Sequence, residues 1–288
     1  MAVATLKQSG YTVTDACQTL GFSRSSYYGL QNSKPVEKGI AEIKDTVLIE
    51  KIQAIKTEHP YWGYRRIRAW LVHREKFIVN EKKVRRIMKE QGLSVLQMVH
   101  KVKRTSSKSK PKAEQPKQFW GIDMTKFTVN ALGWVYLVIV LDWYTKKVVG
   151  WDISLRSKAG DWKQAIDMAV NRAFPEGVRG SGLKLISDNG SQPTSVSFMS
   201  EMANLEIEQI FTSYDNPKGN AETERMIRTI KEEVIWLNEF ETLEEAKEKI
   251  GNWIEVFYNK LYVHSRLGYM SPEEFEVSYN QDKIKKIA

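Results

Sequence analysis

Apolar residues in the first hundred positions recur at helical spacing, whereas those after residue 117 gather in short runs that are typical of strands. The later runs are rich in Val, Ile, Tyr and Trp, and turn sequences separate the first three of them. Three antiparallel strands are therefore expected first, followed by helices and strands in alternation. The predicted strands span 118–129, 134–142, 147–154, 183–187 and 207–212, and the predicted helices span 159–174, 195–204 and 220–236.

This order of elements predicts an α/β domain built on a mixed five-stranded sheet. It is the order that a ribonuclease-H-like fold gives. The chain is therefore expected to divide into an all-α, helix-turn-helix-type N-terminal region at 1–100 and a ribonuclease-H-like core at 118–240. A length of 288 residues agrees with two domains and a small third part, here a helical extension at 241–288 that packs on the core.

Residues 11–30 predict two short helices around a turn. Gly21 interrupts the helical spacing, and Ser23 is placed to cap the second helix. A small residue at Cys17 and an aromatic residue at Tyr27 suit helix-turn-helix packing. Any pair of antiparallel helices could show the same pattern, so both interpretations stay open.

A second helical module is predicted at 40–93. A helix over 40–56 carries its apolar residues on one half of its circumference. A later helix begins after Asn80, a suitable cap, and ends at Gly92. The predicted inner face of this later helix consists of Val84, Ile87 and Met88, and its other faces carry Lys82, Lys83, Arg85, Arg86 and Lys89.

Positive charge is concentrated in the N-terminal region. Residues 1–118 carry 24 Lys and Arg against 10 Asp and Glu, whereas 119–288 carries 20 against 25, within a net charge of +9. Five cations on one helix repel one another unless a polyanion neutralises them. The pattern favours contact with nucleic acid over a merely solvated surface.

The stretch 101–117 contains seven Lys or Arg, three Ser and two Pro, and almost nothing to bury. It is interpreted as an extended basic linker. Lys101, Lys103 and Arg104 could neutralise a phosphate backbone without folding. A plain solvated linker explains the same composition.

Composition excludes several classes of protein. A hydrophobic fraction of 42% is ordinary for a globular chain, and no apolar run approaches the roughly 20 residues of a membrane-spanning helix. The first residues lack a secretion signal. The single cysteine, Cys17, excludes an internal disulfide framework and a cysteine-built zinc site. We expect a soluble cytoplasmic protein with no membrane partner.

Three carboxylates occupy positions where chemistry is expected. Asp123 lies mid-strand among apolar neighbours, where an aspartate is costly without a metal ion or hydrogen bonds. Asp188 directly follows a strand, and open α/β sheets place their sites at such ends. Glu224 lies one turn into the long helix. By position alone, Asp142 and Asp152, also at strand ends, are rivals for the role of Asp123.

Converging carboxylates repel one another strongly unless a cation lies between them. With two Mg²⁺ ions they become ligands that activate a water or hydroxyl and stabilise the leaving oxygen of a phosphodiester. Hard oxygen ligands suit Mg²⁺ or Mn²⁺ rather than zinc. Arg228 and Lys231 share the Glu224 face of the helix. Lys231, about 10 Å along the helix from Glu224, could hold a phosphate backbone.

The spacing of these residues forms a recognisable motif. Thirty-five residues separate Asp188 from Glu224, and Lys231 lies seven residues beyond the glutamate. The chain resembles the insertion-sequence transposases of the D,D(35)E type, in the family founded by the third numbered element. The resemblance covers nearly the whole chain, through residues 20–28, 61–66, 119–125, 187–190, 220–231, 257–259, 264–269 and 271–272.

The resemblance implies that Asp123, Asp188 and Glu224 are the metal-binding catalytic triad, with two Mg²⁺ ions for which Mn²⁺ can substitute. It also implies that Lys231 contacts DNA near the element end, and it disfavours Asp142, which lies on the second strand. Other DNA contacts are expected from Asn189, Arg228, Arg65, Arg66, Arg68, Lys82, Lys83, Arg85, Arg86, Lys101, Lys103 and Arg104.

Glu222 is another acidic competitor for the role of Glu224, and two nearby positions differ from the family pattern. Glu222 has the wrong spacing, and on a helix it points about 200° away from Glu224. Gly219 stands before Asn220 where family members often have an aspartate. Tyr262 stands where many members have an arginine.

The resemblance also implies an activity. The chain is expected to bind terminal inverted repeats and to cut and join DNA strands through a circular intermediate, as at least a dimer on paired ends. An upstream-frame DNA-binding protein is a candidate fusion partner, and the expected place of action is the nucleoid of a bacterial cytoplasm. Two other functions stay open: a ribonuclease-H-like nuclease that does not join strands, and a DNA-binding regulator with an inactive core.

The C-terminal part predicts one amphipathic helix over 243–258, followed by a proline-containing turn. Trp253, Phe257 and Tyr258 are expected to pack onto the core. For His264 and Arg266, a buried or capping role is favoured over contact with DNA.

Overall fold

The computed structural model describes residues 2–24, 27–28, 45–95, 111–212 and 219–287. It divides into two compact units, Met1–Lys44 and Asp45–Ala288. Several predictions lie outside the described residues, namely the start of the helix over 40–56 and most of the basic linker, including Lys101, Lys103 and Arg104. In the part that is described, no helix has both the length and the apolar character needed to span a membrane.

The first unit contains α1 (Ala2–Gln8) and α2 (Val13–Thr19). Thr12 caps α2 by accepting a hydrogen bond from the backbone N–H of Asp15 at 3.2 Å. Gly21 follows α2 with a φ of +61°, a left-handed conformation that suits glycine at a helix end. Cys17 and Tyr27 are buried together as predicted, so the one cysteine serves packing here. The helix α1 was not predicted.

The second unit begins with a helical module of α4 (Asp45–Glu58), α5 (Tyr64–His73) and α6 (Glu81–Glu90). The predicted cap of α6 is confirmed, because the side chain of Asn80 accepts from the N–H of Lys82 at 2.8 Å. The predicted inner face is confirmed too, since the buried residues of α6 are Val84, Ile87 and Met88. We refer to residues 45–90 as the α4–α6 module.

A five-stranded sheet follows in the order β3-β2-β1-β4-β5. The strands β1 (Phe119–Val129), β2 (Gly133–Asp142) and β3 (Val148–Ser154) pair antiparallel. The strands β4 (Lys184–Ser187) and β5 (Glu208–Phe211) extend the sheet in parallel from β1. All five predicted strands are present within a residue of their expected bounds, and the mixed topology confirms the predicted ribonuclease-H-like fold.

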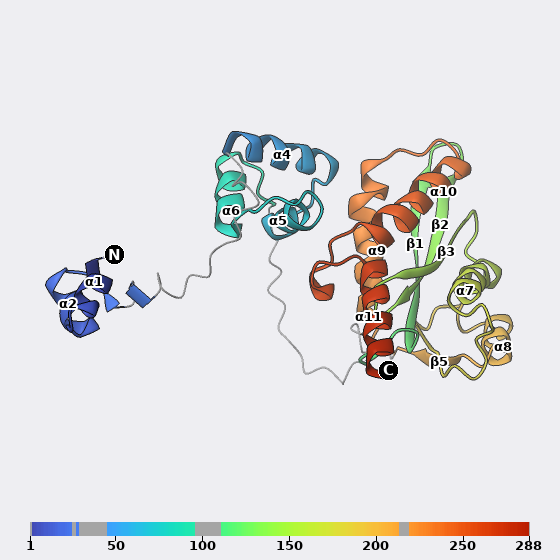
Figure 1. Cartoon of the computed structure of the whole chain (residues 1–288). Helices are drawn as coiled ribbons and strands as arrows, with labels where there is room; N and C mark the ends of the chain where they lie inside the picture. Colours follow the sequence, from blue (N-terminus) through green and yellow to red (C-terminus); the bar gives the residue numbers. More distant parts are fainter. Residues whose placement is uncertain (1, 25–26, 29–44, 96–110, 213–218, 288) are drawn as a thin grey trace. The chain divides into compact units, whose positions relative to one another are not determined.

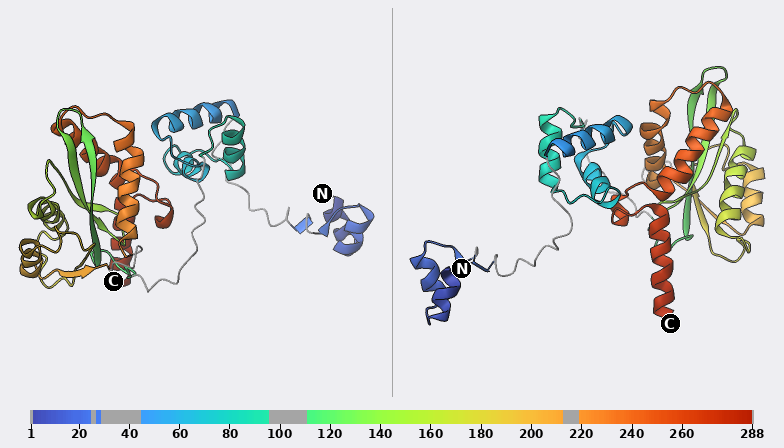
Figure 2. Two further views of the ribbon diagram at one scale, coloured as in Figure 1. Left: turned by 180° about the vertical axis from the view of Figure 1, so that it is seen from behind. Right: turned by 45° about the horizontal axis from the view of Figure 1, so that its top comes forward.

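Helices cover both faces of this sheet (Figures 1 and 2). On one face lie α7 (Ala159–Ala173) and α8 (Val196–Asn204), and on the other lie α9 (Ala221–Glu233) and α10 (Leu243–Asn252). Side chains alternate along β1, so Trp120 and Ile122 enter the apolar cluster under α7 and α8. Gly121 and Asp123 therefore belong to the face that α9 covers.

The C-terminal part differs from the prediction in two ways. The predicted single helix over 243–258 is α-helical only to Asn252 and continues as a π-helical segment, Trp253–Tyr258. The predicted turn at Pro272 is instead the first residue of a long helix, α11 (Pro272–Ile287). Ser271 and Glu274 form a reciprocal cap there, because each side chain accepts from the backbone N–H of the other, at 3.3 and 2.8 Å.

Candidate active site

Two of the three predicted catalytic carboxylates lie at the same level of neighbouring strands. The last paired positions of the parallel strands β1 and β4 are Gly121 and Ile186. Asp123 and Asp188 each lie two residues beyond this pair. Side chains two residues apart in a strand share a face, so both aspartates belong to the face that α9 covers.

The start of α9 is fixed against this part of β1. A Cβ atom on Gly121 would lie only 2.0 Å from Oγ1 of Thr223, so α9 approaches the strand at a distance that glycine alone allows. Asn220 donates through Nδ2 to the carbonyl of Ile122 at 3.0 Å, and Trp143 donates through Nε1 to Thr223 Oγ1 at 3.2 Å. These contacts hold the first turn of α9, with Glu224, beside Asp123.

The other two predicted carboxylates affect the pKa of Asp123. Burial is the main cause that raises the pKa of Asp123 to about 7, and repulsion from Asp188 and Glu224 raises it further. A hydrogen bond from the N–H of Met124 to Asp123 Oδ1, at 2.7 Å, and the charge of Lys231 act in the opposite direction. The charges of Asp188, Glu224 and Lys231 therefore all act on the Asp123 carboxylate.

The loop after β4 presents Asp188 at the surface. The N–H of Gly190 donates to Asp188 Oδ1 at 3.0 Å. The neighbouring Asn189 turns the other way and donates through Nδ2 to the carbonyl of Thr212, which closely follows β5. Asn189, predicted as a DNA contact, thus ties the ends of two strands together and thereby positions Asp188.

The donor set fits a hard divalent cation. Among the described residues, no three His, Cys, Asp or Glu side chains lie close enough together to hold a metal ion as they stand. The side chains of Asp188 and Glu224 are exposed, however, so rotation about their side-chain bonds can bring their oxygens toward an ion near Asp123. Three mutually repelling carboxylates with oxygen donors match the preference of Mg²⁺ or Mn²⁺.

The rival carboxylates have other partners. Asp142 is buried and accepts from the N–H groups of Tyr144 and Thr145, both at 2.9 Å, and from the N–H of Lys117 at 2.7 Å. It therefore closes the turn between β2 and β3. Asp152 lies on β3, which β2 and β1 separate from β4. Neither has an electrostatic environment shared with the other predicted site carboxylates.

Glu222 faces away from Glu224, as the helical geometry predicts. It pairs with Lys146 at 3.0 Å and with Arg266 at 2.5 Å, and so links α9 to the segments on both sides of it. His264 is half-buried, and burial, followed by the charge of Lys146, lowers its pKa to about 4. The burial of His264 agrees with the role predicted for it, whereas Arg266 is 65% exposed and pairs with Glu222.

Four of the predicted DNA contacts, Lys82, Lys83, Arg85 and Arg86, lie on α6. The side chains of Lys82, Arg85, Arg86 and Lys89 are exposed, whereas Lys83 is half-buried. Asp45 of α4 pairs with Lys83 at 2.9 Å and with Arg86 at 2.8 Å, so part of the repulsion on α6 is relieved within the chain.

The other predicted cations have diverse surroundings. Arg65 is exposed and lies 3.7 Å from Glu81, while Arg68 donates to the carbonyl of Val79 at 3.2 Å. Arg228 pairs with Glu232 at 2.8 Å on the outer face of α9. Arg66 points into the contact between the α4–α6 module and α9 described below.

Comparison with known proteins agrees with this architecture. Models of an integrase core domain match residues 113–217 and 205–272, and a model of a helix-turn-helix-like domain matches residues 42–101. The last match falls on the α4–α6 module and does not cover the predicted helix-turn-helix at 11–30, which stays a prediction.

This chain aligns with two curated relatives over almost their full length. The transposase for insertion sequence element IS904 of Lactococcus lactis is 32% identical over 83% of this chain and 96% of that protein. An uncharacterized 31 kDa protein of insertion element IS600 of Shigella sonnei is 29% identical over 92% of this chain and 98% of that protein. The chain belongs to the insertion-sequence transposase family. The predicted family and the predicted class of enzyme, an integrase-type polynucleotidyl transferase, are thereby confirmed.

Solved structures similar to this transposase include retroviral integrase cores. The catalytic core domain of the HTLV-2 integrase in complex with magnesium has 16% identity and a TM-score of 0.44, over 57% of this chain and 99% of that chain. The catalytic core domain of the BIV integrase has 19% identity and a TM-score of 0.43, over 58% of this chain and 99% of that chain. Transposases with an integrase core depend on a divalent metal ion.

Sequence reasoning missed several residues that build the site of this transposase. Gly121, Thr223 and Trp143 set the approach of α9 to β1. A glycine between Trp120 and Ile122 in a buried strand was the available signal, because glycine inside a strand marks a close approach of another element.

Proposed function

We propose that this chain cuts and joins DNA strands with Asp123, Asp188 and Glu224 as its catalytic carboxylates. The observation that carries the proposal is the shared electrostatic environment of these three residues and Lys231 on one face of β1, β4 and α9. Of the rival carboxylates, Asp142 accepts backbone hydrogen bonds in the turn after β2, and Glu222 pairs with Lys146 and Arg266.

Asp123, Asp188 and Glu224 would hold two Mg²⁺ ions in our proposal, with Mn²⁺ as a substitute. The ions would lower the pKa of the attacking water and stabilise the charge on the leaving oxygen. Lys231 lies on the same stretch of α9 and is placed to neutralise a phosphate oxygen near Asp123. Glu224 is held in register by Asn220 and Thr223, which pin the start of α9 to β1.

The reaction needs no covalent intermediate with the protein. In cleavage, the oxygen of a water attacks phosphorus in line with the 3′-oxygen, so that a new P–O bond forms as the P–O bond to the 3′-oxygen breaks. In joining, the released 3′-hydroxyl attacks a second phosphodiester in the same manner. In both steps the proton of the nucleophile passes to solvent and the leaving oxygen is protonated.

DNA recognition is assigned to the helical part of the chain. The exposed cations of α6 offer a surface for phosphates, and we propose that residues 1–100 recognise the terminal inverted repeats while 118–240 holds the target strand. Residues 101–117 would link them, with 241–288 packed on the core. Assembly as at least a dimer on paired ends, a circular intermediate, and action in the bacterial cytoplasm complete the proposal. A fusion with an upstream-frame protein is compatible with it.

The experiment incubates the full chain with labelled DNA that carries the ends of the element, in Mg²⁺, in Mn²⁺ and in chelator. DNA of equal length with scrambled ends is the matched control. We expect metal-dependent nicks at the element ends together with joined products, and neither product with scrambled ends.

Two other outcomes identify the competing functions. Nicks without joined products would support a nuclease of the same fold. Binding to the ends without any nick, in either metal, would support a DNA-binding regulator and contradict the proposal.

A further inference from the structure

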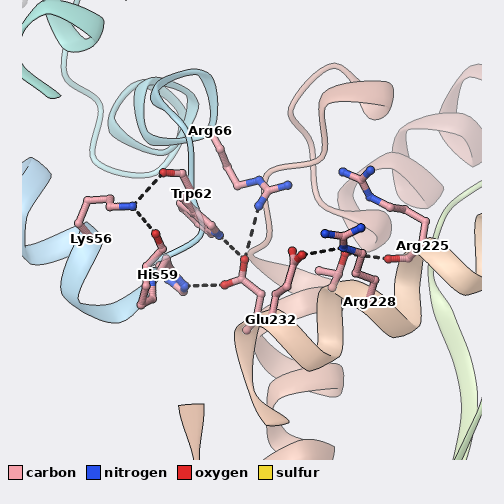
Figure 3. A network of polar contacts seen from close by, with 10 residues as sticks. Lys56, His59, Trp62, Arg66, Arg225, Arg228 and Glu232 are labelled. Carbon is pink, nitrogen blue, oxygen red and sulfur yellow. Dashed lines mark hydrogen bonds and ion pairs between the residues drawn. The ribbon is translucent and has the colours of Figure 1, made fainter. Parts of the chain in front are cut away.

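A buried carboxylate lies at the end of α9 that is remote from Glu224. Glu233, the last residue of the helix, is 2% exposed in its side chain. Its carboxylate accepts from Trp62 Nε1 at 2.5 Å and lies 2.9 Å from His59 Nδ1. Arg66 adds a third contact through Nη1 at 3.5 Å. Figure 3 shows these donors reaching from the α4–α6 module toward α9.

All the donors come from residues 56–66, which span the end of α4, the connection to α5 and the first turn of α5. His59 stacks on Trp62 with ring centroids 4.0 Å apart and planes 9° apart. The guanidinium of Arg66 lies over the ring of Trp62 at 5.5 Å. Lys56 donates to the backbone carbonyls of Pro60 and Trp62, and burial lowers its pKa against the opposing attraction of Glu233. The segment is therefore organised around the Glu233 carboxylate.

Aromatic residues of the C-terminal part close the contact. Phe257, in the π-helical segment, stacks on His59 with centroids 5.0 Å apart. Tyr262 lies edge-on to Trp62 at 5.9 Å and beneath the guanidinium of Arg66 at 5.1 Å. The residues that receive the 56–66 segment thus come from α9 and from the segment that follows α10.

A second, independent contact joins the same two parts. Arg74, just after α5, forms a bidentate pair with Glu274 of α11, at 2.7 and 2.8 Å. It also donates through Nε to the carbonyl of Leu261 at 2.8 Å. Two fixed points, each with directional hydrogen bonds, define an orientation where one point would permit rotation.

We propose that residues 56–66 form an intramolecular docking site for the end of α9, which holds the α4–α6 module at a fixed place on the catalytic core. A consequence, which rests on the proposed function, is that docking sets the distance along DNA between the bound module and the phosphodiester that is cut. The helix α9 is a rigid rod for this purpose, because Glu224 and Glu233 lie nine residues, or about 14 Å, apart on it.

Three side chains of this segment contact Glu233, and another side chain of the segment stays exposed. Trp62, His59 and Arg66 contact Glu233, while Arg65 is exposed on the first turn of α5. The motif at 61–66 therefore serves two partners: its inward residues bind α9, and its outward arginine is available to the phosphate backbone.

The test of docking uses hydrogen exchange on the full chain without DNA. Glu233→Gln removes the charge and keeps the volume, and Trp62→Phe keeps the stacked ring and removes the N–H donor. We expect the amides of α5 and of the last turn of α9 to exchange about tenfold faster in both variants, the change that loss of one charge-assisted hydrogen bond gives. Glu232→Gln is the control. It removes only the pair with Arg228 within α9, so it should leave the exchange of α5 unchanged.

Faster exchange in the last turn of α9 alone, with α5 unaffected, would overturn docking. So would equal effects of Glu233→Gln and Glu232→Gln. This readout needs no activity, so it decides the docking site even if the chain fails to cut DNA and the proposed function fails.

The consequence for DNA is read from the position of the cut. A variant that is only partly unfolded cuts less DNA at every phosphodiester, but the distribution of cuts among the phosphodiesters stays the same. Undocking should instead spread the cuts of Glu233→Gln and Trp62→Phe over several neighbouring phosphodiesters, while affinity for the element ends stays within about threefold of wild type. Cuts confined to the wild-type phosphodiester in an undocked variant would overturn the distance-setting role.

Discussion

Asp123 is a carboxylate in a strand whose neighbours are buried in the core. Its raised pKa shows that the folded chain holds this ionised group at a cost. Nearby, Gly121 has no side chain because Thr223 occupies the place where one would lie. Both residues are unfavourable choices for a stable strand, and both are explained by a site at which a metal ion and the helix that carries Glu224 must come close.

Asp123→Asn is expected to raise the thermal midpoint of the metal-free protein while it removes activity. The folded-state pKa of about 7 lies above the unfolded value of 3.8, so the cost is present when the carboxylate is ionised above pH 7. The free energy of unfolding of Asp123→Asn should exceed that of the wild type by on the order of 1–2 kcal/mol at pH 8, and this difference should become smaller as the pH falls from 7 to 4. Scanning calorimetry of both proteins at several pH values measures this difference.

Added Mg²⁺ supplies the control for this prediction. It should raise the midpoint of the wild type and leave that of Asp123→Asn unchanged, because only the wild type gains a ligand that binds the folded state. Equal stabilisation of both proteins by Mg²⁺ would contradict a role of Asp123 in metal binding.

Gly121→Ala is expected to displace α9 from β1. The new Cβ would lie 2.0 Å from Thr223 Oγ1 and 2.3 Å from Trp143 Nε1, so we expect a loss of about 2–4 kcal/mol of stability and of DNA cleavage. Gly160→Ala is the matched control, because a Cβ on Gly160 in α7 meets no atom within 4 Å. Chemical denaturation should show Gly160→Ala at least as stable as wild type.

At this scale the sequence points to the proposed catalytic carboxylates more clearly than to the residues that support them. Asp123, Asp188 and Glu224 could be proposed because each stands at an unusual place in a periodic pattern, and their spacing resembles that of a known family. Glu233 could not, since its partners His59 and Trp62 lie more than 170 residues away in the chain. No local pattern distinguishes a glutamate that will be buried by such partners from one that stays solvated.

Among the elements, strands and helices follow from hydrophobic periodicity wherever one face is buried. The five strands and the helices α7, α8 and α9 were predicted because their apolar positions alternate at clear periods. The helix α11 was not predicted because Pro272 was interpreted as a turn residue, although proline is favoured in the first turn of a helix. The serine before it and the glutamate three residues after the serine were the usable signal.

The exposed cations of α6 are expected to provide affinity for DNA. Replacing Lys82, Arg85 and Lys89 together by glutamine should weaken binding to the element ends roughly 10- to 100-fold near 0.1 M salt, and lower the slope of log affinity against log salt by about 3. The matched control replaces Lys163, Lys247 and Lys249, three lysines on α7 and α10. If both triple variants lost affinity equally in a gel-shift titration, α6 would have no special role.

On the scale of the whole unit from Asp45 to Ala288, two contacts join the α4–α6 module to the catalytic core. One contact uses the buried carboxylate of Glu233 and the other the bidentate pair of Arg74 and Glu274, and both require a specific geometry. The sequence gives no sign of this arrangement, because its predicted boundary treats the module and the core as separate domains. Contacts between distant segments depend on tertiary packing, and hydrophobic periodicity reports only on local structure.

The pair of Arg74 with Glu274 should make the stability of this unit sensitive to acid. Hydrogen bonds from Arg74 are the main cause that lowers the pKa of Glu274 from 4.5 to about 2. Its contribution is therefore complete above pH 4.5 and is lost as the pH falls toward 2. Because Glu274 is 44% exposed, Glu274→Gln should cost only about 1 kcal/mol at pH 6.

Denaturant titrations of wild type and Glu274→Gln at pH 6 and at pH 3 measure this dependence. The difference in free energy of unfolding between the two proteins should be smaller at pH 3 than at pH 6. Glu273→Gln, on the same turn of α11, should show a smaller difference at pH 6. A difference for Glu274→Gln that is independent of pH would contradict a role of the ionised carboxylate.

The measurement that tests the central claim most directly compares DNA cleavage and joining by Glu224→Gln and Glu232→Gln, both glutamates of α9. Each change removes one negative charge and keeps the side-chain volume. We predict that Glu224→Gln lowers metal-dependent cleavage at least about 100-fold while it still binds the element ends, and that Glu232→Gln stays within about threefold of wild type. Cleavage by Glu224→Gln at the wild-type rate in Mg²⁺ would contradict the assignment of the active site.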